Sequence, residues 1–488
     1  MSDLRLAVGT DNTTAAADNV LRALDEVRVI VRVDGRSDAF AASAAGALVS
    51  MLGRLHAHVE IDGDADCGRN PWAAETVTDV LARLTAQRPV PSATPVRDLI
   101  VGVGLPGDLC IGGDDWTARI GREPSIAAGS SSGLGLHAAA AFAAAEVFKR
   151  TLGPLGMSVV PAEFEWDLLT YRYGRSDPPP PIKEPEPLLF AAAGSVNSSA
   201  AAQLMGLRMP GRAVVVDPDA FDSERNPYRY PASTGTTEGA KATWVAGLLS
   251  AAGWDATGIV TGIGDWVCSQ PQPGFDGVLL SSVDSVTGRG EVADVLARTT
   301  LSAGVHGLRL HVQREHCFDA FACPNCDFVA EGDPITQVQV VADMTGIELA
   351  RAAELLLGAG LTSEDLAVVV GSGRLGAANA DALVGRRVQD LLGRLYAEAS
   401  VPVVGSDAVR VSAPFVSWIS GTLLAVEVAK TAARVPLVGR RVDLDMAGVP
   451  AGAVGRRPRD PDGRCTCVSR WRRRAAQRLY GKPEALAV

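Results

Sequence analysis

Short apolar runs alternate with helix-like segments along the second half of the chain, and this alternation most restricts its fold. Apolar runs lie at 188–193, 213–216, 277–281 and 308–312, and the segments between most of them contain helix-like stretches. Such runs predict strands that are buried on both faces, which occur in parallel sheets covered by helices. We therefore expect an α/β fold with a doubly wound, mostly parallel sheet.

A proline-rich stretch, SDPPPPIKEPEP at 176–187, marks a break in the chain. Proline neither continues a helix nor joins a central strand, so the stretch predicts an extended linker, or alternatively a surface loop within one domain. The chain has 488 residues, which is more than a single hydrophobic core accommodates, because such cores stop growing at roughly 250–300 residues. We expect an N-terminal α/β half at 1–175, a nucleotide-binding domain at 188–334, a helical insert at 335–400 and a closing strand, helix and metal-binding tail at 401–488.

Two helix-like segments resemble each other across the break. SGLGLHAAAAFAAAEVFKR at 132–150 and APFVSWISGTLLAVEVAK at 413–430 both end in A-x-E-V-x-K. This similarity favours a duplicated α/β unit whose degenerate first copy has lost its motifs, although two Ala-rich helices can also match by chance. A duplicated chain would form a pseudo-dimer by itself. A homodimer of two whole chains is a further possible assembly.

The composition argues against several classes of protein. The formal charge of −10 is unfavourable for a nucleic-acid binder that relies on overall charge. The start, MSDLRLAVGTDNTT, lacks the basic and apolar regions of a secretory signal, and no apolar run reaches the ~20 residues of a membrane span. We expect a cytoplasmic protein with no membrane association.

The segment LLFAAAGSVNSSAAAQLMGL at 188–207 is typical of a phosphate-binding turn between a strand and a helix. A nucleotide fingerprint would place glycine at Ala192 and Asn197, and only Gly194 remains. Alanine at the first position narrows the turn, whereas asparagine tolerates a positive φ better than most residues. The turn is either a working variant or the remains of a phosphate loop.

Polar residues follow the later strands where a nucleotide would lie. Asp217 ends the second apolar run about twenty residues after the turn, where an acidic residue meets a ribose hydroxyl in doubly wound folds. Arg229 and Lys241 are candidates for phosphate binding, and Asp284, after the run at 277–281, is a candidate Mg²⁺ ligand. Each of these residues alone is more often a solvated cap, but that interpretation does not explain their shared order.

The succession AAGSVNS, VVDPD, NPYR, GAK and SSVD resembles the ubiquitin-activating-enzyme-like superfamily, which includes the ThiF/MoeB/HesA adenylyltransferases. The later segment SAPFVSWISGTLLAVEVAK also resembles the closing loop and helix of that family. The resemblance covers about two-fifths of the chain and implies a Rossmann-like ATP-binding adenylation domain. It places Gly194 in the nucleotide turn and Asp217 at the ATP ribose.

The resemblance also implies roles for four later residues. It assigns Asn226, Arg229 and Lys241 to the phosphates of ATP, and Asp284 to Mg²⁺. The implied reaction is attack of a carboxylate on the α-phosphate, with catalysis by positioning and charge neutralisation. The acceptor would be the C-terminus of a ubiquitin-like or sulfur-carrier protein, or of a peptide in a biosynthetic pathway.

The chain departs from the family pattern in several positions, so an inactive scaffold is an alternative to an enzyme. Besides the missing glycines, the stretch from Asp217 to Asn226 is one residue longer than expected, and G-A-K is shorter than G-x-x-K. A scaffold that binds a partner without chemistry would tolerate these changes.

Four of the eight cysteines fall into two close pairs. FACPNCDF contains Cys323 and Cys326, and DGRCTCVSR contains Cys465 and Cys467. Two close pairs of thiolates are typical of a closed tetrahedral Zn²⁺ site, and free thiols or a redox pair are the alternatives. The resembling family places its cysteine pairs in similar positions.

A thioester step would need a cysteine outside these pairs. Cys268 and Cys317 are the candidates, because no cysteine lies between Asp327 and Arg464. Most lone cysteines are inert small hydrophobic residues, so neither is assigned this role by sequence alone.

Overall fold

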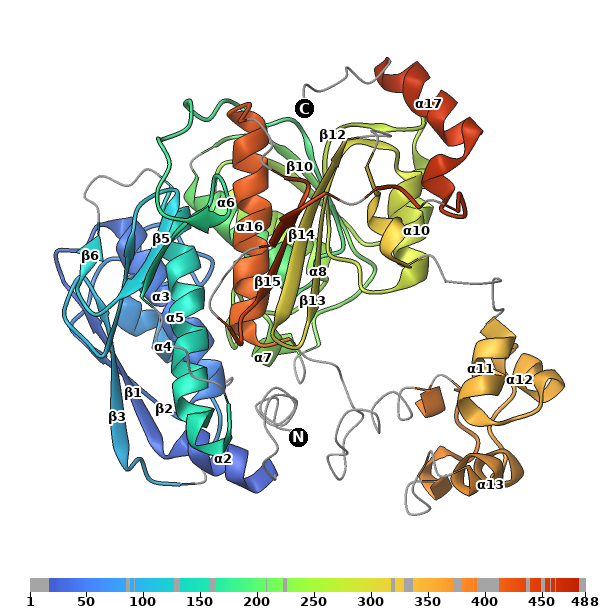
Figure 1. Ribbon diagram of the computed structural model, residues 1–488, viewed down its shortest axis with the longest axis horizontal. Coiled ribbons are helices and arrows are strands. Elements are labelled where there is room, and N and C mark those ends of the chain that lie inside the picture. The colour runs from blue at the N-terminus through green and yellow to red at the C-terminus, as the bar shows by residue number, and fades with distance from the viewer. Residues whose placement is uncertain are drawn as a thin grey trace. The chain divides into compact units, whose positions relative to one another are not determined.

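The chain divides into two compact units, one formed by Asp18–Phe328 with Ser412–Val488 and the other by Met1–Ala17 with Val329–Val411. The computed structural model describes residues 17–84, 88–91, 93–126, 132–157, 163–207, 209–222, 226–316, 321–328, 337–372, 375, 380–388, 390–392, 412–435, 439–448, 453–456, 458–460 and 462–481. The first unit holds two β-sheets, which define an N-terminal and a C-terminal lobe (Figure 1).

An eight-stranded sheet of order β11-β10-β9-β12-β13-β14-β15-β16 organises the C-terminal lobe. Its strands are β9 (Leu188–Ala191), β10 (Arg212–Val216), β11 (Asp255–Ile259), β12 (Phe275–Ser281), β13 (Ala297–His306), β14 (Arg309–His316), β15 (Arg441–Asp445) and β16 (Ala453–Gly455). The strands from β11 to β13 are parallel, and the last three extend the sheet in antiparallel pairing. The expected doubly wound, mostly parallel sheet is confirmed.

Helices cover both faces of this sheet. They are α6 (Ser195–Gly206), α7 (Asn226–Arg229), α8 (Lys241–Ala251), α9 (Ile263–Ser269), α10 (Val286–Asp294), α16 (Pro414–Ala432) and α17 (Arg470–Tyr480), with short 3₁₀ turns η3 (Pro324–Phe328) and η5 (Thr466–Val468). Alternate residues of β9 point to opposite faces, and Leu189 and Ala191 pack with Trp266 of α9 and Val292 of α10. The long helix α16 contacts α6, β13 and β14.

The N-terminal lobe has a second sheet of order β2-β1-β3-β4-β5-β7-β8, with β6 beside β4. Its elements are α2 (Ala17–Asp25), β1 (Val27–Val33), α3 (Ala39–Leu55), β2 (His58–Asp62), α4 (Val77–Arg83), β3 (Arg97–Val103), β4 (Leu109–Gly113), β5 (Thr117–Gly121), β6 (Ser125–Ile126), α5 (Leu134–Leu152), η2 (Gly153–Leu155), β7 (Phe164–Asp167) and β8 (Arg172–Tyr173). Four parallel strands are again followed by antiparallel ones. In both lobes the long helix, α5 or α16, precedes a strand, β7 or β15, that pairs antiparallel with an earlier strand, β5 or β14.

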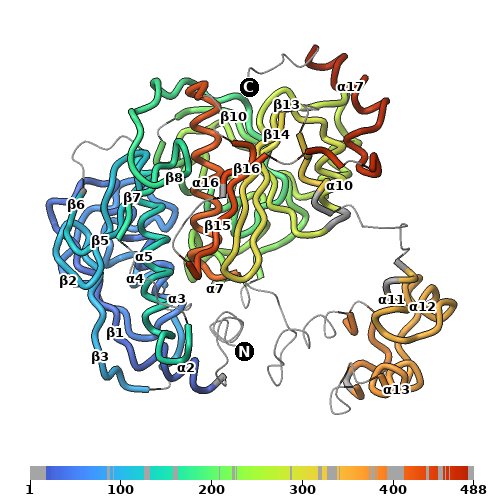
Figure 2. Tube along the Cα trace, in the orientation of Figure 1, coloured from blue at the N-terminus to red at the C-terminus, as the bar shows by residue number. Residues whose placement is uncertain are grey.

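The two lobes meet along α5 and α16, which run side by side in the tube trace (Figure 2). Each of these helices ends in a buried Glu-x-x-Lys pair, Glu146 with Lys149 and Glu427 with Lys430. Lys149 donates to the carbonyl of Gly448 in the C-terminal lobe at 3.1 Å. Reciprocally, Lys430 lies 3.6 Å from the centre of the Tyr171 ring, next to the N-terminal sheet. The lysine near the end of each helix is thus paired with a glutamate of the same helix and also contacts the opposite lobe.

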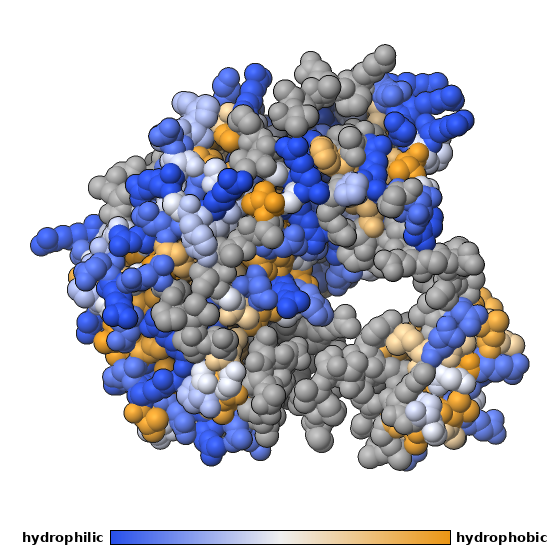
Figure 3. Space-filling view, viewed as in Figure 1, coloured by the Kyte–Doolittle hydropathy of each residue, from blue (hydrophilic) through white to orange (hydrophobic). Residues whose placement is uncertain are grey.

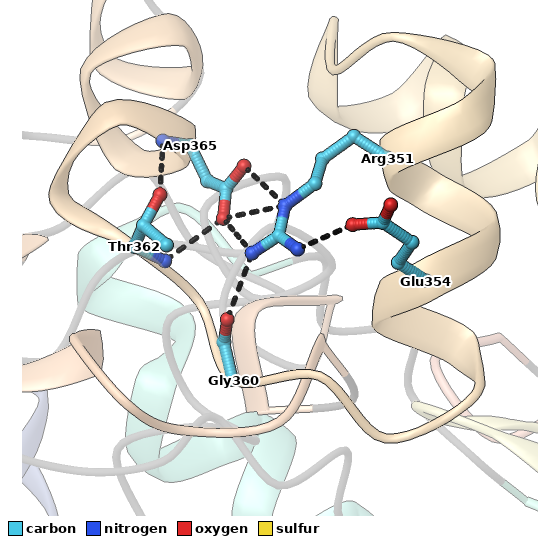
Figure 4. A network of polar contacts seen from close by, with 5 residues as sticks. All are labelled: Arg351, Glu354, Gly360, Thr362 and Asp365. Carbon is cyan, nitrogen blue, oxygen red and sulfur yellow. Dashed lines mark hydrogen bonds and ion pairs between the residues drawn. The ribbon is translucent and has the colours of Figure 1, made fainter.

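Helices also form the described part of the second unit, which has its own core. It comprises α11 (Gln337–Thr345), α12 (Leu349–Leu356), α13 (Ser363–Gly371) and the turn η4 (Asp381–Leu383), packed around buried residues that include Leu355, Leu366 and Leu391. Arg351 on α12 makes a two-pronged contact with Asp365 and donates to the carbonyl of Gly360 (Figure 4). Asp365 also closes a capping box with Thr362 at the start of α13. The segment AVVV at 367–370, which looks strand-like in sequence, lies within α13.

No helix among the described residues is long and apolar enough to cross a membrane. Helix α17, with the sequence RWRRRAAQRLY, is strongly basic and lies in a mostly hydrophilic region of the space-filling view (Figure 3), although Trp471 and Leu479 are exposed on it.

Acidification is expected to destabilise the lobe interface through His137 of α5. Burial lowers the pKa of His137 to about 3 from 6.5, and its ring lies 5.7 Å from that of Trp418 on α16. Between these two values the unfolded chain binds a proton that the folded chain excludes. The free energy of unfolding should therefore decrease as the pH is lowered through this window, by up to about 1.4 kcal/mol per pH unit.

Denaturant unfolding between about pH 4 and 7 measures this dependence. The His137→Gln variant should show a shallower slope of stability against pH, whereas the exposed His306→Gln control should keep that of the wild type. An unchanged slope in His137→Gln would contradict the assignment.

Candidate functional site

The chain order of the C-terminal sheet reverses between β9 and β12. Strands β10 and β11 lie on one side of β9, whereas β12 and β13 lie on the other. The connections that leave these two central strands therefore turn to opposite faces of the sheet. In open α/β sheets the ligand binds outside the carboxyl ends of such strands, so the candidate site comprises the segments that follow β9, β10 and β12.

The turn after β9 contains strain at one of the two positions where glycine was expected. Ala192 has a φ of 74°, in the left-handed region that a Cβ makes unfavourable. Asn197 lies within α6 and has no positive φ, so its tolerance of such a conformation is not used here. Its side chain instead donates to the carbonyls of Ala191 at 3.1 Å, Ala192 at 2.7 Å and Leu280 at 3.4 Å. The buried amide of Asn197 therefore braces the turn and links it to the end of β12.

Gly194 precedes α6 and leaves its N-terminus open. Its backbone is extended, and no side chain among the described residues caps the helix. A Cβ at Gly194 would meet only the hydroxyl of Ser282, at 3.8 Å. The Ser282 hydroxyl is itself buried without a hydrogen-bond partner among the described residues. The uncapped amides at the start of α6, the absence of a side chain at Gly194 and the hydroxyl of Ser282 together suit an anionic group such as phosphate.

Asp217 follows β10 and is turned toward the turn after β9. Its carboxylate accepts from the amide of Ala193 at 2.6 Å and from that of Asp219 at 2.8 Å. Burial raises the pKa of Asp217, while these two hydrogen bonds oppose the shift. Asp217 therefore fastens the two strand ends to each other, a contact that its expected role at a ribose did not include.

Lys241 begins α8 and lies beside the end of β10. Its ammonium pairs with Asp219 at 2.8 Å, and its amide donates to the carbonyl of Asp219 at 3.0 Å. The Lys241 side chain is only 12% exposed, whereas that of Asp219 is 65% exposed. A phosphate group would therefore compete with Asp219 for this ammonium. The sequence interpretation overlooked Asp219, although VVDPD offered two acidic residues.

Asn226 and Arg229 are placed by the short helix α7. Asn226 is 5% exposed, and its Nδ2 has no hydrogen-bond partner among the described residues. The carbonyl of Arg229 accepts from the Ser195 hydroxyl at the start of α6, at 2.5 Å. This contact joins α7 to the open N-terminus of α6.

Several charged residues of the candidate site lie near the hydroxyl of Tyr230. Burial is the main reason that its pKa lies well above 10, and the charges of Asp217, Asp219 and Asp284 raise it further, while Arg229 lowers it. Asp284, which follows β12, is exposed. The segments that follow β10 and β12 therefore place three carboxylates and a guanidinium within electrostatic reach of one hydroxyl. Sequence patterns alone did not single out Tyr230.

The four paired cysteines converge into one cluster. Their sulfur atoms lie within 4.8 Å of one another, with distances of 3.5 Å for Cys323–Cys465, 3.8 Å for Cys323–Cys326 and 3.5 Å for Cys326–Cys467. A tetrahedral ion with bonds of about 2.3 Å has sulfur–sulfur edges of about 3.8 Å, close to these values, whereas a disulfide is about 2.05 Å long. The cluster can hold a metal ion and would join the chain after β14 to the C-terminal tail.

The two candidates for a thioester differ in what the structure describes. Cys268 is exposed on α9. Cys317 lies outside the described residues. The role of either thiol stays a prediction.

Comparisons with known proteins give only a distant likeness. No protein-family model and no curated protein match the chain. Solved structures that match include Escherichia coli MccB with MccA-N7isoASN, at 11% identity and a TM-score of 0.35, covering 58% of this chain and 67% of that one. MccB alone matches at 11% identity and a TM-score of 0.34, covering 56% of this chain and 63% of that one. MccB with ATP matches at 11% identity and a TM-score of 0.33, covering 57% of this chain and 65% of that one.

The chain thus spans about two thirds of the length of these proteins. At these TM-scores the likeness carries no argument about function, which rests on the geometry of the site.

Replacing Ala192 with glycine is expected to stabilise the turn. The left-handed conformation costs alanine about 1–2 kcal/mol, and glycine loses about 0.5–1 kcal/mol through its greater freedom in the unfolded chain. The Ala192→Gly variant should therefore match or exceed the wild type in unfolding free energy, by up to about 1.5 kcal/mol. Denaturant unfolding checks this, with Ala191→Gly in β9 as a control that should lose stability. A loss in Ala192→Gly as large as in the control would refute the strain.

Removing the metal ligands is expected to release bound metal and loosen the tail. Elemental analysis should find about one Zn²⁺ per wild-type chain, and none in Cys323→Ser or Cys467→Ser, because a structural site needs all four thiolates. The Cys268→Ser control should retain the metal. Wild-type protein that holds no metal after purification with added zinc would rule out the site.

Proposed function

We propose that this chain is an ATP-dependent adenylyltransferase that activates the C-terminal carboxylate of a peptide or of a ubiquitin-like or sulfur-carrier protein. The observation that carries this proposal is the open N-terminus of α6 at the strand-order reversal. Beside it are the hydroxyl of Ser282, which has no partner among the described residues, and segments that carry two basic and three acidic side chains, Arg229, Lys241, Asp217, Asp219 and Asp284. The order of motifs in the sequence supports the same reaction through its resemblance to the ThiF/MoeB/HesA adenylyltransferases.

Each predicted residue has a place in this proposal. Gly194 and the amides that begin α6 would receive one phosphate group, with Ser282 donating its hydroxyl. Arg229 and Lys241 would neutralise the phosphate charge, and Asn226 would donate through its Nδ2, which has no partner among the described residues. Helix amides, guanidinium and ammonium are the donors that phosphate prefers.

Two acidic residues would serve the metal and the turn. Asp284 is exposed at the carboxyl end of β12 and would hold Mg²⁺, for which carboxylate oxygen is a suitable ligand. Asp217 would support the turn through the amide of Ala193, and its remaining acceptor capacity would be available to a ribose hydroxyl. Asp219 would exchange its contact with Lys241 for solvent when phosphate arrives.

Bound Mg·ATP would supply an electrophilic α-phosphorus and a pyrophosphate leaving group. A carboxylate oxygen of the acceptor forms the new bond to phosphorus, and the bond from phosphorus to the pyrophosphate oxygen breaks. The protein residues contribute orientation and charge neutralisation, which are large terms in reactions of this kind. The cysteine cluster would be a structural Zn²⁺ site, because four thiolates leave no open coordination position.

The two-lobed architecture supports an N-terminal half that is structural. Both sheets pass from parallel to antiparallel strands, and each has its long helix before a late strand. A duplicated chain in which one copy keeps the site would form a pseudo-dimer. The reciprocal contacts of Lys149 and Lys430 are the kind that two-fold related copies make.

An inactive scaffold is the second candidate, and two observations favour it. Ala192 is strained where glycine would relax the turn, and Lys241 is already paired with Asp219. In that case the site would bind a partner without chemistry. An adenylating enzyme of a peptide natural-product pathway would use the same residues as the main proposal and differ only in the acceptor.

Calorimetric titration of Mg·ATP into the purified chain separates an enzyme from a scaffold. The wild type should bind one nucleotide, and both Asp284→Ala and Lys241→Ala should weaken binding at least tenfold, which corresponds to about 1.4 kcal/mol. Asp276→Ala, which removes an exposed acid beside Arg298 near the other end of β12, is the matched control and should bind as the wild type does.

Thermal stability gives an independent readout of the same binding. At a hundredfold excess of Mg·ATP over Kd, the wild type should gain about 2.7 kcal/mol of stability. Neither heat nor stabilisation in the wild type would overturn ATP binding and favour the scaffold. With binding established, pyrophosphate exchange in the presence of candidate carriers or peptides would identify the acceptor.

A further inference from the structure

The segment that follows α7 is held by side chains of the N-terminal lobe. The hydroxyl of Ser50 and the indole Nε1 of Trp72 both donate to the carbonyl of Pro231, at 2.6 and 2.8 Å. Ser50 belongs to α3, and both side chains are almost wholly buried. The segment 230–233 is itself buried, so its carbonyls depend on protein donors instead of water.

Arg54, one turn further along α3, is at the centre of this contact. Its guanidinium donates to the carbonyl of Tyr230 at 2.9 Å and to that of Ser233 at 2.8 Å. The same group returns to α3, where it donates to the carbonyl of Ser50 at 2.7 Å and to the Ser50 hydroxyl at 2.5 Å. Arg54 is 2% exposed. A single buried side chain therefore connects α3 with two carbonyls of a segment more than a hundred residues away.

The energetics favour a positional role over a purely stabilising one. Removing a guanidinium from water is costly, and burial lowers the pKa of Arg54 to about 9. An apolar side chain would avoid this cost, but it would leave the carbonyls of Tyr230 and Ser233 without the donor that Arg54 supplies. The planar guanidinium does provide donors at fixed angles that reach two carbonyls at once, which an ammonium on a flexible stem cannot reproduce.

The held segment is continuous with the candidate phosphate residues. The amide of Tyr230 donates to the carbonyl of Asn226 at 3.1 Å, and Arg229 lies between these two residues. On its other side, α7 is joined to the start of α6 through the hydroxyl of Ser195. Helix α7 is therefore fixed from two directions, by Arg54 of the N-terminal lobe and by Ser195 of the C-terminal lobe.

We infer that Arg54 is a positioning residue, which holds the segment 226–233 so that Asn226 and Arg229 meet the phosphates of the nucleotide. This inference rests on the proposed function for its ligand, and it gives the N-terminal lobe a direct part in the site. Arg54 acts through the backbone of Tyr230 and Ser233 and is not a catalytic residue.

Hydrogen–deuterium exchange of the nucleotide-free chain tests the positioning itself. The Arg54→Met variant should exchange amides of segment 226–235 faster than the wild type, and Arg54→Lys should lie between them because lysine reaches only one carbonyl. Arg69→Met is the matched control, since Arg69 also donates from the N-terminal lobe to a C-terminal carbonyl, that of Ala252 at 3.0 Å. The control should leave segment 226–235 unchanged.

A double-mutant cycle on Mg·ATP affinity tests the consequence for the site. Arg54→Met should raise Kd by on the order of tenfold to a hundredfold, as small displacements of binding groups do. Arg229→Ala should cost less in the Arg54→Met background than in the wild type, because a misplaced Arg229 contributes little. Lys241→Ala, on a different element, should cost the same in both backgrounds.

The outcomes separate failure of this inference from failure of the proposed function. Unchanged exchange of segment 226–235 in Arg54→Met overturns the inference, whatever the nucleotide result. Faster exchange with unchanged Kd, or additive effects of Arg54→Met and Arg229→Ala, overturns the link to phosphate binding. If the wild type binds no Mg·ATP, the proposed function fails and so does the link, while the exchange result still decides whether Arg54 holds the segment.

Discussion

The buried amide of Asn197 joins the ends of the two strands at which the sheet reverses its order. Its Nδ2 donates to the carbonyls of Ala191, which ends β9, and of Ala192, and it reaches that of Leu280 in β12. Without this side chain these carbonyls would lose a buried donor, and a buried acceptor that is left unsatisfied costs about 1–3 kcal/mol. The amide therefore compensates for the strained Ala192, and the open end of α6 keeps its place beside Ser282.

A second constraint is the burial of charge between the lobes. Lys149, Lys430 and Arg54 are each almost wholly buried, and each reaches the opposite lobe. Losing such a contact leaves a buried polar group with one partner fewer, which costs more than losing a surface ion pair. The lobes are thus specific partners, and the residues of the candidate site are supported by a lobe that contributes none of the residues predicted from motifs.

The architecture and the ligand positions could be predicted from sequence to different degrees. The runs at 188–193, 213–216 and 277–281 became β9, β10 and β12, because buried parallel strands have a continuous apolar pattern. Strand β11, with the sequence DATGI, was missed because it is short, partly exposed and weakly apolar. Strand β13 was missed because it contains polar residues that a mixed sheet accommodates. The cysteine cluster was predictable because thiolate pairs at close spacing have few other uses.

The sequence by itself determined the α/β class, the position of the turn and the identity of the polar residues after each strand. These features are local, since periodicity and spacing are set by neighbouring residues. Only the tertiary structure decided that Asn197 braces the turn through its side chain, that Lys241 pairs with Asp219 and that Arg54 holds the segment after α7. Such contacts depend on distance and burial in three dimensions, and residues far apart in the chain leave no local pattern that reveals them.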